Sequence, residues 1–147
     1  MLVQSPSNSC FESGVHPLKI RGTKAANGHY YLPALVACGN PEFVRPTLFL
    51  VDLGATRTTL VAERLGLSCN GLGNGDPTLS SMGQHTPYCI SNVLVVFETS
   101  HGKQHVELLE KVDVIKLENC PFDGLLGIDI VNRFRLRTDK NGLTFES

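Results

Sequence analysis

Short runs of apolar residues, each followed by turn-forming residues, make up most of the chain. Several of these runs have the length and the content of β-branched and aromatic residues that are typical of strands. Turn dipeptides such as Asn27-Gly28 and Asn141-Gly142 separate them. The pattern therefore predicts a mainly β protein. The expected strands cover residues 17–21, 30–37, 47–51, 90–98, 106–114 and 135–138.

Two segments depart from this pattern. Apolar residues in 59–67 recur at helical spacing near Gly66, and residues 128–134 can form one or two helical turns after Gly127. We therefore expect two short helices at most. Between them, residues 68–84 are rich in Gly, Asn, Ser and Pro, which indicates a mobile loop or a hairpin.

Length and composition limit the chain to one domain. With 147 residues, of which 41% are hydrophobic, it can build a single packed core. Residues 1–15 lack hydrophobic periodicity, so we expect a flexible leader followed by one domain over residues 16–147. The 13 basic and 14 acidic residues nearly cancel, which argues against nucleic acid and membrane as partners.

The N-terminus and the cysteines indicate a compartment. The first residues have neither a basic start nor a sustained apolar run, which argues against a secretory signal, and no segment has the roughly 18 consecutive apolar residues of a membrane span. The five cysteines are scattered and odd in number, so we expect free, mostly buried thiols. A reducing, cytoplasmic location is the expectation.

An acidic residue, Asp52, stands directly after the apolar run that ends at Val51, and Leu53, Gly54 and Ala55 follow it. A carboxylate in such sheltered surroundings is costly to ionise unless hydrogen bonds stabilise it. The residues alone leave two interpretations open, an Asp that caps the following turn and an Asp with a chemical task.

The segment from Asp52 to Ala55 resembles the Asp-Thr/Ser-Gly-Ala signature of retropepsin-like (retroviral-type) aspartic proteases. Residues 122–129 resemble the second landmark of that family, two hydrophobic residues and a glycine before a short helix. Residues 134–145 resemble its last strands, and the resemblance as a whole covers residues 28–147. It implies an all-β, single-lobe acid protease fold.

The resemblance also implies a homodimer with twofold symmetry. Each catalytic loop of the family contributes one Asp, and this chain carries one such loop, because Asp123 and Asp129 lie in the structural landmark. The second carboxylate would be Asp52 of an identical chain. Two close carboxylates share one proton, so that one activates water while the other stabilises the oxyanion. The implied activity is hydrolysis of peptide or protein substrates, with no cofactor and no metal.

The same resemblance indicates which residues bind substrate. Small residues in the catalytic loop let a peptide backbone approach Asp52. Residues 79–88 resemble the hairpin that closes over substrate in the family, and an ordinary surface hairpin is the alternative, since Gly and Ser are common in any turn. The residues expected to contact substrate are Gly54, Ala55, Ser81, Met82 and Gly83.

Leu53 departs from the family pattern, which has Thr or Ser at this position. The family's hydroxyl forms a hydrogen bond across the dimer axis and braces the opposite loop, which Leu53 cannot do. A buried partner group without its hydrogen bond costs about 1–3 kcal/mol, and apolar contact between two Leu53 side chains can offset part of this. A catalytically impaired, protease-like module that dimerises or binds peptides is therefore the alternative function.

Two further patterns carry less weight. His101 and His105 are four residues apart, but Gly102 and the flanking β-type runs favour a hairpin turn over a metal site on a helix. Residues 71–75 have the glycine content of a nucleotide-binding loop without its preceding strand or its lysine, so we interpret them as a flexible loop.

Overall fold

The structure, a computed structural model, describes residues 18–80 and 83–147. Strands make up 54% of it, which confirms the prediction of a mainly β protein. The elements, in chain order, are β2 (Lys19–Lys24), β3 (Tyr30–Gly39), β4 (Glu42–Val51), β5 (Thr59–Val61), α2 (Ala62–Leu65), β6 (Gly73–Asn74), β7 (Thr78–Ser80), β8 (Gly83–His85), β9 (Tyr88–Glu98), β10 (Gln104–Ile115), β11 (Gly124–Leu126), α3 (Ile128–Val131), β12 (Arg135–Thr138) and β13 (Gly142–Glu146).

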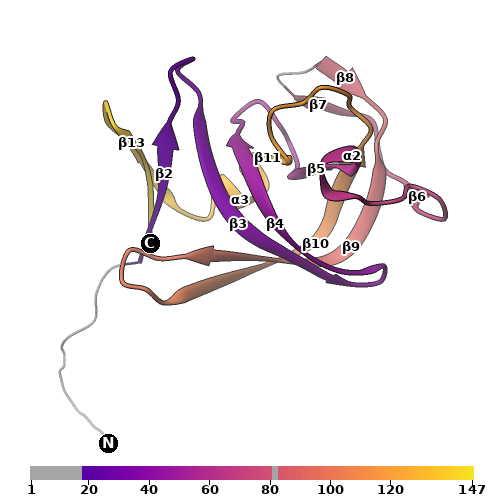
Figure 1. The fold of residues 1–147 in the computed structure, drawn as a ribbon, viewed down its shortest axis with the longest axis horizontal. Helices are drawn as coiled ribbons and strands as arrows, with labels where there is room; N and C mark the ends of the chain where they lie inside the picture. Colours follow the sequence, from indigo (N-terminus) through magenta and orange to yellow (C-terminus); the bar gives the residue numbers. More distant parts are fainter. Residues whose placement is uncertain (1–17, 81–82) are drawn as a thin grey trace, which may run out of the picture.

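Six strands close into a barrel in the order β3, β4, β11, β5, β10 and β9, because β9 pairs back onto β3 (Figure 1). Alternate residues of each strand point inward, so each strand contributes every second side chain to the core. Phe49 of β4 and Phe97 of β9 are fully buried there. Burial of such a side chain stabilises the fold by about 1.5–3 kcal/mol.

The short strand β11 fits between β4 and β5 because it begins with a glycine. A Cβ atom at Gly124 would lie 2.6 Å from the Thr59 carbonyl oxygen and 2.9 Å from the Phe49 ring. β11 runs parallel to β4 and antiparallel to β5. This pairing places Leu126 beside Val51, the last residue before Asp52.

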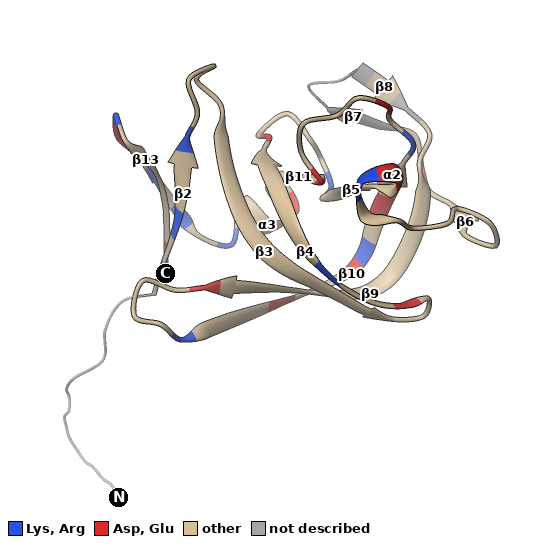
Figure 2. Cartoon of the chain, in the orientation of Figure 1, with Lys and Arg blue, Asp and Glu red and all other residues tan. Residues whose placement is uncertain are grey.

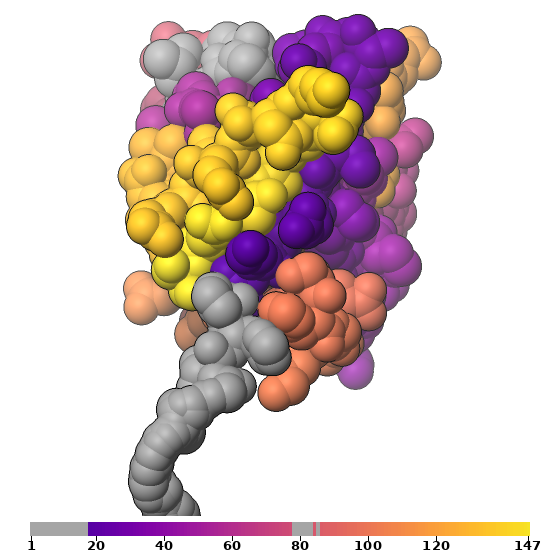
Figure 3. All heavy atoms as spheres, turned by 90° about the vertical axis from the view of Figure 1, so that its left-hand side faces the viewer, coloured from indigo at the N-terminus to yellow at the C-terminus, as the bar shows by residue number. Residues whose placement is uncertain are grey.

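A three-stranded sheet of β2, β13 and β12 extends the barrel beyond β3 (Figures 1 and 3). Its inward side chains Ile20, Leu143 and Phe145 are buried in the main core. Phe145 stacks on Phe134, with ring centroids 5.4 Å apart. The sheet is therefore packed onto the barrel through an apolar face and leaves its other face outward.

The structure contains the expected strands, of which 135–138 has the predicted limits and the others differ somewhat, and it corrects one helix boundary. Residues 59–61, predicted as helical, form β5, and the helix α2 covers Ala62–Leu65. Pairing decides this, because β5 bonds to β10 on one side and to β11 on the other, and its three residues are buried. The predicted helix after Gly127 is present as α3, and Gly66 ends α2 in the left-handed conformation at φ 66°.

Four of the five cysteines lie in the described part of the chain and all four are free thiols. Cys38, Cys69 and Cys120 are buried and Cys89 is half-buried, as predicted, while Cys10 lies outside the described residues, as does the leader 1–15. In residues 18–80 and 83–147, no helix is long and apolar enough to cross a membrane.

Candidate active site

Asp52 sits at the end of β4 in a tight, hydrogen-bonded turn. Its backbone N–H donates to the Leu126 carbonyl at 3.0 Å, and its own carbonyl accepts from the Ala55 N–H at 3.1 Å. Its side-chain Oδ1 accepts from the Gly54 N–H at 2.9 Å. The side chain is thus a turn cap, as one of the two sequence interpretations expects, and the turn holds the carboxylate in one orientation.

The residues after Asp52 alternate between buried and exposed positions. Asp52 is 6% exposed, whereas Leu53 is 57% exposed and Gly54 is also exposed. Ala55 is buried, and its carbonyl accepts from the Ile128 N–H at 3.0 Å. The loop therefore presents Leu53 and Gly54 outward while Ala55 anchors it to α3. The Ala55 methyl group, expected beside the substrate, packs inside.

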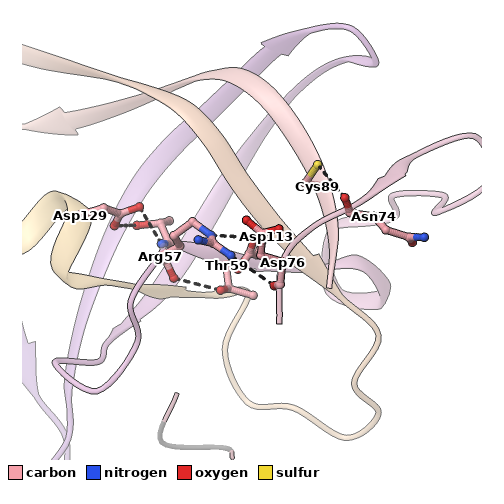
Figure 4. Close-up of polar contacts among 8 residues, drawn as sticks. Arg57, Thr59, Asn74, Asp76, Cys89, Asp113 and Asp129 are labelled. Carbon is pink, nitrogen blue, oxygen red and sulfur yellow. Dashed lines mark hydrogen bonds and ion pairs between the residues drawn. The ribbon is translucent and has the colours of Figure 1, made fainter. Parts of the chain in front are cut away.

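Asp129 of α3 is hydrogen-bonded to the loop that follows Asp52 (Figure 4). Its carboxylate accepts from the Thr58 hydroxyl at 2.7 Å and from the Thr58 N–H at 2.9 Å. The same hydroxyl accepts from the Gly127 N–H at 3.2 Å. A Cβ atom at Gly127 would lie 2.6 Å from the Arg57 carbonyl carbon, so only glycine allows α3 to approach the loop this closely.

Asp123 has a similar bracing function at the start of β11. Its Oδ2 accepts from the Leu48 N–H at 2.7 Å, and its Oδ1 accepts from Arg64 Nε at 3.0 Å. The carboxylate thereby joins β4 and α2. The positions of Asp123 and Asp129 agree with their interpretation as part of a structural landmark.

An ion pair with a buried carboxylate, which the sequence did not predict, links the loop after Asp52 to β10. Arg57 Nε lies 3.2 and 3.3 Å from the two carboxylate oxygens of Asp113, and its second amino group donates to the Asp76 carbonyl at 3.3 Å (Figure 4). The Asp113 side chain is fully buried. Removing one partner of such a pair costs roughly 3–5 kcal/mol, because an uncompensated charge remains inside. The one sequence signal was an Asp flanked by Val112, Val114 and Ile115.

The segment between Asp76 and Pro87 forms a hairpin, as predicted. β7 and β8 pair in an antiparallel two-stranded sheet, with Ser80 opposite Gly83. Its base is closed where the Gly75 N–H donates to the Pro87 carbonyl at 2.8 Å. Of the three substrate-binding residues expected in this hairpin, Gly83 lies in β8, and Ser81 and Met82 lie outside the described residues.

A second charged cluster joins β10 to the segment after α3. Arg133 donates to Glu107 at 2.7 Å, and His105 pairs with the other oxygen of the same carboxylate. Burial opposes ionisation of Glu107, but the hydrogen bonds from Arg133 and His105 outweigh it and lower its pKa. His105 also contacts Phe134 edge-on.

In the described ranges, no group of three or more His, Cys, Asp or Glu side chains is arranged to hold a metal ion.

Comparison with solved structures identifies the fold. The chain is similar to a retropepsin-like aspartic protease from Rickettsia conorii, with a TM-score of 0.55 and 23% sequence identity over 92% of this chain and 95% of that one. No protein-family model and no curated protein matches the sequence. The resemblance inferred from two short motifs is thus confirmed at the level of the fold, which is retropepsin-like.

Proposed function

We propose that the chain is one subunit of a homodimeric aspartic endopeptidase in which Asp52 supplies half of the active site. The observation that carries this proposal is the Asp52 loop. A carboxylate that is 6% exposed ends a barrel strand, is oriented by the Gly54 N–H at 2.9 Å and lies within a retropepsin-like fold. Acids held in sheltered, oriented positions are typical of catalytic sites.

The need for a second carboxylate supports the dimer. The other buried or bracing carboxylates near the loop have structural partners, since Asp113 pairs with Arg57 and Asp129 with Thr58. Asp52 of a second chain is the remaining source, across a twofold axis. The exposed side chain of Leu53 next to Asp52 is the kind of surface that a second copy would cover.

The two Asp52 carboxylates would act as an acid–base pair. Like charges at short distance cannot both ionise, so the pair keeps one proton at working pH. The ionised member takes a proton from water as the water oxygen attacks the scissile carbonyl carbon. The protonated member donates a hydrogen bond to the developing oxyanion and then a proton to the leaving amine.

The substrate would be a peptide in extended conformation. Gly54 is exposed beside Asp52 and leaves room for a peptide backbone. The hairpin of β7 and β8 would cover the bound peptide and exclude water, and Ser81, Met82 and Gly83 are the proposed substrate contacts of this segment. Main-chain hydrogen bonds would then supply affinity, and side-chain pockets would supply selectivity.

Asp52→Asn tests the proposal. Asn keeps the size of the side chain and can still accept the bond from the Gly54 N–H, but it cannot exchange the catalytic proton. We expect cleavage of an unfolded protein substrate to be lost, while sedimentation still shows a dimer. Asp139→Asn makes the same chemical change at an exposed turn and should retain activity.

Two results would contradict the mechanism. Near wild-type turnover in Asp52→Asn would remove Asp52 from the chemistry. A strictly monomeric protein that still cleaves would remove the shared site. Inhibition of the wild-type protein by a pepstatin-class compound, with insensitivity to chelators, would support an aspartic mechanism without a metal.

Leu53 favours one alternative, a catalytically impaired module that dimerises or binds peptides. At 57% exposure, Leu53 offers apolar surface for association but no hydroxyl to brace the partner loop. This alternative would be favoured if the wild-type protein formed dimers and bound peptides but cleaved none of them at any pH tested.

A further inference from the structure

The outward face of the sheet formed by β2, β13 and β12 is basic. Strand register places Lys19, Glu146 and Arg135 in one row across the three strands, and Arg21, Thr144 and Arg137 in the next. The intervening residues, such as Ile20 and Phe145, point into the barrel and are buried. Alternation along the strands therefore gathers four cations and one carboxylate on a single face, and Figure 2 marks charged positions along these strands.

This concentration of positive charge differs from the balance of the whole chain, whose net charge is −1. The three strands and the turn between β12 and β13 contain six of the 13 basic residues but two of the 14 acidic residues, so the rest of the chain is clearly acidic. The basic residues are Lys19, Arg21, Lys24, Arg135, Arg137 and Lys140, and the acidic residues are Asp139 and Glu146.

The two acidic residues, Glu146 and Asp139, neutralise only part of the positive charge of the sheet. The side chain of Glu146 is 14% exposed and lies 3.1 Å from Arg137 and 3.9 Å from Arg135, whose side chains are 70% and 80% exposed. Asp139 caps its own turn by accepting from the N–H groups of Asn141 and Gly142. In the described chain no ion pair involves Lys19 or Arg21. Glu146 thus orients two guanidinium groups that still present donors outward.

A small hollow lies at one end of the same sheet. Its volume is about 140 Å³, and Arg21, Thr144, Asn141 and Asp139 contribute to its lining. Gly22 and Gly142, which also line it, have no side chains to fill it. Arg21 supplies guanidinium donors for one ligand carboxylate at this hollow, whereas Asp139, which accepts from the N–H groups of its own turn, opposes it by its charge.

We propose that this face, the basic sheet face of Lys19, Arg21, Arg135 and Arg137, binds an acidic polypeptide segment in extended conformation. Cations two residues apart on a strand are spaced by about 6.6–6.8 Å, which is also the spacing of alternate side chains of an extended peptide. Carboxylates at alternate positions of the segment can therefore meet successive cations. The carboxylate of Glu146, held by Arg137 at 3.1 Å, is an example of this contact within the chain.

Other occupants match the face less well. Among the described residues of the face none is aromatic, so bases of a single-stranded nucleic acid would have nothing to stack on. Its outward rows carry no apolar side chain that could enter a membrane. A second copy of the chain that docked through the same face would bring like charges together. The inference is independent of catalysis by Asp52.

Fluorescence anisotropy with a labelled peptide of alternating Glu and Thr tests the proposal. The matched probe is the same peptide with Gln in place of Glu, and mass spectrometry checks that both stay intact. We expect the Glu peptide to bind and the Gln peptide not to bind, with affinity falling as salt is raised. Arg21→Gln combined with Arg135→Gln should weaken binding by about tenfold, since each exposed pair contributes up to about fivefold.

The control variant combines Lys103→Gln with Lys111→Gln, which removes the same charge from exposed positions of the β9–β10 hairpin. It should change the affinity by less than about twofold. Equal binding of the Glu and Gln peptides, or equal loss in the control, would overturn the proposal. Tighter binding of an oligouridine RNA or of phosphatidylserine vesicles than of the Glu peptide would also overturn it, because the face would then recognise phosphate.

Discussion

Asp129→Ala should destabilise the protein by removing the brace behind the Asp52 loop. The carboxylate of Asp129 accepts two hydrogen bonds from Thr58, at 2.7 and 2.9 Å. Thr58 is fully buried, so water cannot replace the lost acceptor without local opening. In the variant, the Thr58 hydroxyl and N–H both lose their partner.

The size of the effect follows from these contacts. A hydrogen bond to a charged group contributes roughly 1.5–3 kcal/mol, and Asp129 is partly exposed, so we expect Asp129→Ala to lower the free energy of unfolding by about 3 kcal/mol. Asp129→Asn keeps an oxygen for the Thr58 N–H but leaves the hydroxyl proton without an acceptor. Its cost should be about 1 kcal/mol.

Urea unfolding measures these differences, and a double-mutant cycle with Thr58→Val isolates the contact. Valine removes the hydroxyl while keeping the shape of the side chain. We expect a coupling energy of about 1–2 kcal/mol between the two positions. Glu118→Ala, at an exposed position, should change stability by less than about 0.5 kcal/mol.

An Asp129→Ala variant as stable as the Glu118→Ala control would show that Asp129 does not stabilise the fold. A coupling energy near zero would mean that Asp129 acts through something other than Thr58. Loss of stability without loss of the cleavage proposed above would show that the brace supports the fold but not the geometry of Asp52.

Two further predictions concern Leu53 and Glu107. Leu53→Thr should tighten the dimer or raise kcat/KM by about two- to tenfold, because a hydroxyl can form a hydrogen bond across the dimer axis. Weaker dimerisation together with lower kcat/KM would show instead that the two Leu53 side chains pack well against each other. Glu107→Gln should destabilise the protein most at neutral pH. Because the folded-state pKa of Glu107 lies below the ordinary value of 4.5, its stabilising effect is present above that pH and disappears as the pH falls through the lowered pKa. Chemical denaturation across pH, with Glu110→Gln as an exposed control, should therefore show a difference that narrows in acid; a difference that is constant with pH would contradict this.

Much of the fold could be predicted because its signals are local. Alternating apolar residues and turn dipeptides indicated half of the strands in the described chain, since the period of a strand is visible in a few residues. Gly127 and the apolar residues before it indicated the approach to α3. Residues 59–61 could not be assigned in this way, because a short buried apolar run suits a helix or a strand equally well, and only pairing with β10 and β11 decides between them.

The sequence by itself located the candidate site, because Asp52 follows an apolar strand and precedes small residues within a few positions. Only the tertiary structure decided how that residue is held. Asp129 accepts a hydrogen bond from Thr58, 71 residues away, and Asp113 accepts one from Arg57, 56 residues away. No local pattern encodes which carboxylate meets which donor. The basic sheet face likewise depends on register, since side chains from the two ends of the chain become neighbours only when β2 pairs with β13.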